Sequence, residues 1–89
     1  MKTQTIFNKK LEELYKLEVT YIIQRKNLYK NEDEHIPFIQ ADLEKKEIEI
    51  KERKKVIMKL IYLSGNSFYY LNKWNNYENS IYYFFDWSI

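Results

Sequence analysis

Residues Ile36–Leu63 read IPFIQADLEKKEIEIKERKKVIMKLIYL, and their apolar side chains recur at a fixed interval. One row of residues spaced seven apart consists of Ile36, Leu43, Ile50 and Ile57. A second row with the same spacing consists of Ile39, Lys46, Arg53 and Leu60. Because seven residues make almost two helical turns, each row follows one face of a helix. The stretch therefore predicts a long amphipathic helix, typical of a coiled coil, with Lys46 and Arg53 inside its apolar seam.

The ends of this helix are marked by the only proline and the only glycine of the chain. Pro37 fits the first turn, where its missing N–H is not needed, and Gly65 fits the position just after a helix. These signals predict a helix over 37–64 that follows a polar link at 31–35. The segment 56–63 is apolar almost all round, so we expect it to be the best buried part of the helix.

An earlier helix is predicted over 6–30, with Thr3 or Thr5 as its cap. Its apolar face is built on a row spaced seven apart: Phe7, Leu14, Tyr21 and Leu28. Glu18 and Arg25 interrupt that face. Since an unpaired buried charge is costly, each needs a partner from another helix or from water.

The short link favours antiparallel pairing of these two helices. In the simplest register Glu18 lies level with Lys46, and Arg25 lies level with Asp42. We therefore interpret one set of residues as an interhelical charge seam that fixes register: Glu18, Arg25, Lys46 and Arg53.

The segment 67–89 is compatible with two structures. Its tyrosines and phenylalanines have high β propensity, and Asn75-Asn76 resembles a hairpin turn. However, one helical arc of about 140° collects most of its large apolar residues. They are Tyr70, Leu71, Trp74, Tyr77, Ile81, Phe84, Phe85 and Ile89. We therefore predict an all-α fold, either a three-helix antiparallel bundle or a long helical hairpin with the third helix folded back. The alternative is two helices plus a C-terminal β-hairpin.

Several aromatic side chains of this third helix fall outside its apolar arc, among small polar residues. Exposed Tyr and Trp in such surroundings are typical of a protein interface. The predicted partner interface consists of Phe68, Tyr69, Lys73, Asn76, Tyr83 and Trp87.

Composition excludes several classes of function. The 89 residues form one domain, 1–89, with no cysteine, one histidine and a net charge of +2. No spacing of His, Cys or acidic residues predicts a metal site, and no motif predicts catalysis. No apolar run approaches the roughly 20 residues of a membrane span. We expect a cytoplasmic protein without a cofactor, a metal, an enzymatic activity or a membrane partner.

The sequence thus predicts a non-enzymatic protein that acts by binding another protein through its aromatic C-terminal helix, and that forms a homo-oligomer, with a dimer favoured. Abundant Lys, Asn, Ile and Tyr indicate an AT-rich genome. This bias suggests a phage or mobile-element inhibitor of a host factor, for example an anti-CRISPR protein. The alternative is a nucleic-acid-binding helical module that uses the lysines of the second helix and the exposed aromatics.

Overall fold

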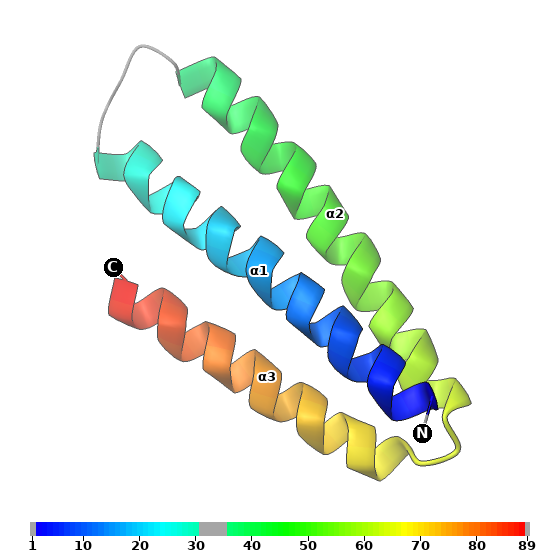
Figure 1. Ribbon diagram of the computed structural model, residues 1–89. Helices are drawn as coiled ribbons and strands as arrows, with labels where there is room; N and C mark the ends of the chain where they lie inside the picture. The colour runs from blue at the N-terminus through cyan, green and yellow to red at the C-terminus, as the bar shows by residue number, and fades with distance from the viewer. Residues whose placement is uncertain (1, 31–35, 89) are drawn as a thin grey trace.

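Three long helices lie side by side in the computed structural model, which describes the backbone of residues 2–30 and 36–88 and the side chains of 3–28 and 37–85. They are α1 (Lys2–Lys30), α2 (Ile36–Leu63) and α3 (Ser67–Ser88). α2 runs antiparallel to α1, and α3 returns beside α1 in the same direction as α1 (Figure 1). The all-α three-helix prediction is confirmed.

The core lies along the predicted apolar rows. Fully or nearly fully buried side chains from all three helices pack in one cluster: Phe7, Leu14, Ile22, Ile50, Ile57, Ile61, Tyr70, Trp74, Tyr77 and Ile81. The rings of Phe7 and Tyr70 lie 4.8 Å apart between their centroids, which ties the start of α1 to the start of α3. Burial of this apolar surface is the main stabilising contribution in a domain of this size.

The hairpin alternative for the C-terminal region is wrong. Residues Ser67–Ser88 are helical, and no strand occurs in 2–30 or 36–88. Four buried side chains of α3 follow one another at intervals of three or four residues: Tyr70, Trp74, Tyr77 and Ile81. That spacing places them together only in a helix, so the tertiary core outweighs the local β propensity of the tyrosines.

α1 begins at Lys2, four residues before the predicted start. The extra turn has a partner in α3, because Gln4 Nε2 donates a hydrogen bond of 2.9 Å to Tyr69 Oη. The predicted cap at Thr3 or Thr5 is therefore wrong, since both residues lie inside the helix.

The end of α2 is buried on one side only. Ile57 and Ile61 are fully buried, as predicted, but Tyr62 is 75% exposed and Leu63 is 83% exposed. The expectation that the whole segment 56–63 is the best buried part of α2 is therefore wrong. A helix at the edge of a three-helix bundle meets its neighbours along one stripe, so apolar residues on its other faces remain in contact with solvent.

Gly65 makes the turn into α3 with a φ of 73°, the left-handed conformation predicted for it. Ser64 Oγ donates to the carbonyl of Ile61 at 2.7 Å and accepts from the amide of Asn66 at 3.1 Å. The carbonyl of Asn66 then accepts the first α3 hydrogen bond, from the amide of Tyr70 at 3.4 Å. This tight turn brings the two apolar helix ends next to each other.

Candidate functional site

The predicted interface residues differ in their exposure. Phe68 is 85% exposed and Tyr83 is 63% exposed, and Asn76 is exposed as well. Lys73 is half-buried. Trp87 belongs to the backbone of α3, but its side chain lies outside the described residues.

Tyr69 is held by the bundle although part of its ring is exposed. Its hydroxyl accepts the hydrogen bond from Gln4, and its ring meets the Tyr70 ring edge-on at 5.1 Å. The Lys73 ammonium lies 4.9 Å from the centroid of the Tyr69 ring, within the range of a cation–π contact. These three contacts keep the ring in one orientation and reduce the rotamer entropy that a partner would have to remove on binding.

Tyr82 is an exposed aromatic residue that was not included in the predicted interface. It is 65% exposed, and its ring meets the neighbouring Tyr83 ring edge-on at 6.3 Å between centroids. The prediction followed one line of residues along the helix, and Tyr82 lies about 100° away from that line. Including every α3 aromatic outside the apolar arc would have identified it.

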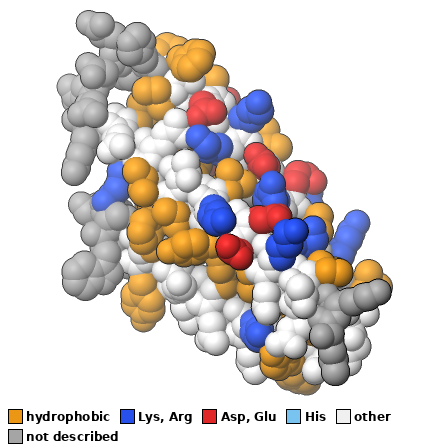
Figure 2. All heavy atoms as spheres, viewed as in Figure 1, with side chains coloured by type: hydrophobic (Ala, Val, Ile, Leu, Met, Phe, Trp, Pro, Cys, Tyr) orange, Lys and Arg blue, Asp and Glu red, His pale blue; other side chains and the backbone are white. Residues whose placement is uncertain are grey.

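We call five side chains the outer aromatic surface of α3: Phe68, Tyr69, Lys73, Tyr82 and Tyr83. Figure 2 shows apolar side chains gathered where the C-terminal halves of α1 and α3 lie next to each other, whereas charged side chains of both signs are interspersed along α2. A hollow of about 390 Å³ lies between α1 and α3, with Tyr82 and Arg25 at its wall. Its remaining lining residues are Glu18, Tyr21, Ile22, Glu78, Ile81 and Phe85.

Glu18 is the buried charged residue among the side chains that the structure describes, and its partners differ from the predicted one. Its Oε1 accepts a hydrogen bond of 2.8 Å from the Tyr77 hydroxyl, and its Oε2 lies 3.6 Å from Lys54 Nζ. The predicted pairing of Glu18 with Lys46 is wrong. The physical reason is that Glu18 also faces α3, where the buried Tyr77 donates a hydrogen bond to it. The prediction paired α1 with α2 only and therefore did not include a partner from α3.

Lys46 instead contacts Asp42 and Gln24. Lys46 Nζ lies 2.8 Å from Asp42 Oδ2 and donates a second hydrogen bond to Gln24 Oε1, while Gln24 Nε2 donates to Asp42 at 2.8 Å. The α1 residue bonded to Asp42 is thus Gln24, the neighbour of Arg25, so that part of the predicted register differs by one residue. Hydrogen bonds from Lys46 and then from Gln24 hold the pKa of Asp42 below its ordinary value.

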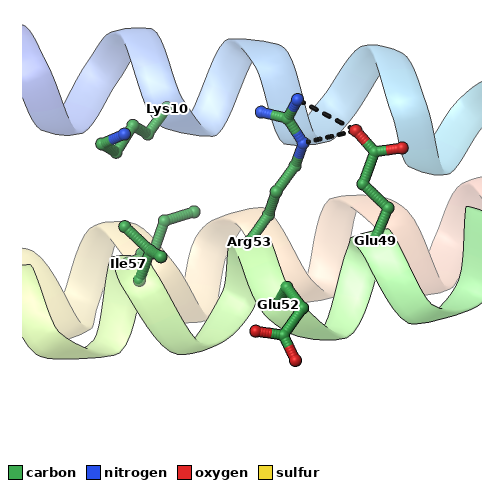
Figure 3. A pocket seen from close by; sticks show the side chains of 6 residues that line it. Lys10, Glu49, Glu52, Arg53 and Ile57 are labelled. Carbon is green, nitrogen blue, oxygen red and sulfur yellow. Dashed lines mark hydrogen bonds and ion pairs between the residues drawn. The ribbon is translucent and has the colours of Figure 1, made fainter.

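Arg53 joins α2 to α1 nearer the other end of the bundle. Its guanidinium lies 3.2 Å from Glu13 and 3.1 Å from Glu49. Figure 3 shows the guanidinium turned toward Glu49, within a hollow of about 300 Å³ that is also lined by Lys10, Glu52, Val56 and Ile57. Since Glu18 and Arg25 line a different hollow, the four predicted seam residues belong to separate groups of contacts rather than to one pocket.

The buried Tyr77 hydroxyl, which is hydrogen-bonded to Glu18, makes the stability of the fold decrease at alkaline pH. Burial, and then this hydrogen bond, raise the pKa of Tyr77 far above its ordinary value of 10.0. The folded protein therefore keeps a proton that the unfolded chain loses, so stability is fully present below about pH 10 and decreases as the pH rises further.

We predict that Tyr77→Phe unfolds more easily than the wild type at neutral pH, by about 1–3 kcal/mol, because the Glu18 carboxylate loses a donor. This difference should shrink as the pH rises above about 10. Urea unfolding at a series of pH values, followed by circular dichroism, measures it. Parallel pH curves for the two proteins would contradict the prediction.

Within 2–30 and 36–88, no three His, Cys, Asp or Glu residues are grouped so that they could hold a metal ion. None of the described helices is both long and apolar enough to span a membrane. The single histidine, His35, lies outside the described residues. Comparison of the chain with protein-family models, with curated proteins and with solved structures gave no match.

Proposed function

We propose that this protein is a small non-enzymatic interaction protein that binds another protein through the outer aromatic surface of α3. The observation that carries the proposal is the exposure of Phe68, Tyr82 and Tyr83, each more than 60% accessible to solvent. A separate set of α3 aromatics, Tyr70 and Trp74 among them, already fills the core. The exposed rings therefore add little to folding, and rings of this kind supply much of the binding energy in protein interfaces.

The surroundings of these rings also suit a protein partner. Asn72, Asn75 and Asn76 are exposed on the same helix and provide hydrogen-bonding groups without charge. Depletion of charge with enrichment of aromatic residues distinguishes interface centres from ordinary surface. In the region from Ser67 to Tyr77, which contains Phe68 and Tyr69, the only charged residue of α3 is Lys73, whereas Glu78 and Asp86 come before and after Tyr82 and Tyr83 in the sequence.

A homo-oligomer, with a dimer favoured, is part of this proposal, and so is a cytoplasmic location. Its most specific form is an inhibitor encoded by a phage or mobile element, of the anti-CRISPR kind, which occupies a surface of a host protein. Small size and AT-rich composition support that form. The target is identified only by chemistry, as a protein surface able to take up exposed tyrosine rings.

The alternative of a nucleic-acid module depends on the lysines of α2, and several of these have acidic partners. Lys54 lies 3.6 Å from Glu18 and 3.8 Å from Glu78, and Lys55 lies 3.7 Å from Glu52. Neutralised lysines contribute less to phosphate binding. Salt separates the two functions, because phosphate binding weakens log-linearly with salt, whereas an aromatic protein interface responds little.

The test compares Tyr82→Ser plus Tyr83→Ser with a matched control, Phe38→Ser plus Ile48→Ser. Both pairs remove two exposed, large apolar side chains, but the control pair lies on α2. We expect the first pair to weaken partner binding by at least about 30-fold, as for loss of an interface hot spot, and the control pair to leave it unchanged.

The measurement has two parts. Light scattering of the wild type over a range of concentrations measures self-association. Affinity capture from a low-GC bacterial lysate identifies a foreign partner, and the binding measurement is then repeated with the purified captured protein. Equal binding by the wild type, the tyrosine variant and the control variant would contradict the proposal.

A further inference from the structure

The charges of this protein are separated along the chain in a pattern that the net charge conceals. Residues 1–11 and 53–77 contain no Asp or Glu, so all thirteen acidic residues lie in 12–52 and 78–89. The acid-free segments nevertheless contain eight basic residues: Lys2, Lys9, Lys10, Arg53, Lys54, Lys55, Lys59 and Lys73. A protein with a net charge of +2 therefore consists of a strongly basic part and an acidic part.

The fold brings the acid-free segments together. The start of α1, the end of α2 and the start of α3 meet at the same end of the bundle, next to the α2–α3 turn (Figure 1). Contacts confirm this placement, because Gln4 of α1 bonds to Tyr69 of α3 and Lys10 shares a hollow with Ile57 of α2. We call this half of the molecule, residues 2–11 and 53–77, the basic end.

Two cations of the basic end, Lys9 and Lys59, lie apart from the acidic side chains that pair with its other basic residues. Arg53, Lys54 and Lys55, at its inner boundary, have acidic partners within 4 Å. Lys9 and Lys59 are exposed, and in the described part of the chain neither has an acidic side chain at ion-pair distance.

The tip of the basic end is apolar. Tyr62 is 75% exposed, Leu63 is 83% exposed and Phe68 is 85% exposed, and the three residues flank the turn at Gly65. No residue between 60 and 72 is charged. At 1.5 Å per residue, Lys59 lies roughly 6 Å behind the end of α2, and Lys73 roughly 9 Å behind the start of α3.

We propose that the basic end docks on an anionic lipid surface, with the apolar tip placed among the acyl chains and the lysines behind it at the headgroup phosphates. Aromatic and aliphatic side chains partition into the interfacial layer, and each lysine near an anionic leaflet adds to the attraction. The lysines can extend toward the phosphates while their alkyl stems stay against apolar surface.

Two features of the basic end favour a lipid surface over a nucleic acid. The outermost residues at the tip are the aliphatic and aromatic side chains next to the turn, and the lysines lie behind them. A nucleic acid would instead need cations at the outermost surface. Its cations near the tip are lysines, which act as point charges and lack the planar fork that reads bases. This docking needs no membrane-spanning helix, so the absence of a long apolar run, from which no membrane partner was expected, does not bear on it.

The first test measures cosedimentation with vesicles of phosphatidylcholine alone and with added phosphatidylglycerol. We expect the wild type to bind the anionic vesicles and to remain in solution with the neutral ones. Lys9→Glu plus Lys59→Glu should weaken binding by at least about tenfold. The control Lys45→Glu plus Lys51→Glu changes the net charge equally within the acidic part and should leave binding nearly unchanged.

The second test examines the tip with residues outside the outer aromatic surface of α3, so that its outcome is independent of the proposed protein interface. Tyr62→Ser plus Leu63→Ser should weaken vesicle binding by about tenfold, since apolar insertion is lost. Phe38→Ser plus Ile48→Ser, exposed residues of the acidic part, should not. Tryptophan at the tip, Leu63→Trp, should be quenched by lipids with brominated acyl chains more strongly than Phe38→Trp.

Several outcomes would overturn the proposal. Equal binding to neutral and anionic vesicles, equal losses in the variant and control pairs, or no added quenching at position 63 would each contradict it. So would binding to duplex DNA that the Lys9/Lys59 variant loses and the Tyr62/Leu63 variant keeps. A mass in solution that rises as the salt concentration is lowered, without vesicle binding, would also contradict it. That result would mean that the basic end binds the acidic part of a second copy of the protein.

Discussion

Trp74→Ala is expected to lower the free energy of unfolding by about 3–5 kcal/mol, the range for deleting a large buried aromatic side chain. Trp74 is almost fully buried and stacks on Tyr77, with 5.4 Å between ring centroids and 24° between ring planes. Its removal opens a void between α2 and α3, and the neighbouring side chains of these two helices cannot fill it unless the helices move. In a domain whose total stability is typically about 5–15 kcal/mol, this loss is large enough to unfold part of the population.

Urea unfolding monitored by circular dichroism measures this loss. Tyr62→Ala serves as the control, because it also removes a large aromatic ring, but from a position that is 75% exposed. We expect the control to change stability by no more than about 0.5 kcal/mol. Similar effects for the two variants would mean that α3 does not pack through Trp74.

The second large effect is expected for Glu18→Ala, about 2–3 kcal/mol of destabilisation. The substitution leaves the Tyr77 hydroxyl buried without its acceptor and removes one of the two carboxylates near Lys54. Because this hydrogen bond joins α1 to α3, the loss should appear as a lower urea midpoint for the whole bundle.

Glu13→Ala is the matched control, since Glu13 also pairs with a cation of α2, Arg53, but at a partly exposed position. Exposed pairs of this kind contribute at most about 1 kcal/mol. Glu18→Gln adds a second comparison, because it keeps an acceptor for Tyr77 and removes only the charge. If neither Glu18 variant is less stable than the Glu13 variant, the buried network is not a stabilising contact.

The apolar rows could be predicted from the sequence because a helix repeats its faces at a fixed angle. Leu43, Ile50 and Ile57 are buried in α2 at the predicted spacing, and Tyr70 and Trp74 are buried in α3. That angle is a property of the backbone and does not depend on the neighbours. The three helices and the faces that they turn toward the core can therefore be predicted from the periodicity of the sequence alone.

The partners of the charges could not be predicted in the same way. The residue facing Glu18 depends on how far the helices slide along each other and on which third helix adds a donor. Lys54, its partner, lies eight residues after the predicted Lys46, roughly 12 Å along the axis. The Gln24–Asp42 hydrogen bond shows that the two helices keep nearly the predicted register, so a slide of that length is not the cause. Nothing local to Glu18 specifies its partner, because the partner depends on all the side chains that pack around it.

The candidate site could be predicted in part, because amphipathicity shows which residues do not face the core. Phe68 and Tyr83 are exposed as expected, but Tyr82 and the tip residues Tyr62 and Leu63 were missed. Their exposure follows from the edges of the three-helix arrangement, where an apolar residue has no helix to cover it. The exposure of Tyr62 and Leu63 becomes visible only when all neighbours of α2 are known, whereas Tyr82 could have been identified as an aromatic residue outside the apolar arc of α3.

The central claim is that the exposed rings of α3 serve binding rather than folding. It is tested most directly by the free energy of unfolding of Tyr82→Ser plus Tyr83→Ser, measured in urea at low protein concentration so that self-association does not contribute. We predict a value within about 1 kcal/mol of the wild type, as for surface substitutions. A loss of more than about 2 kcal/mol would contradict the claim, because it would mean that the bundle needs these rings to fold.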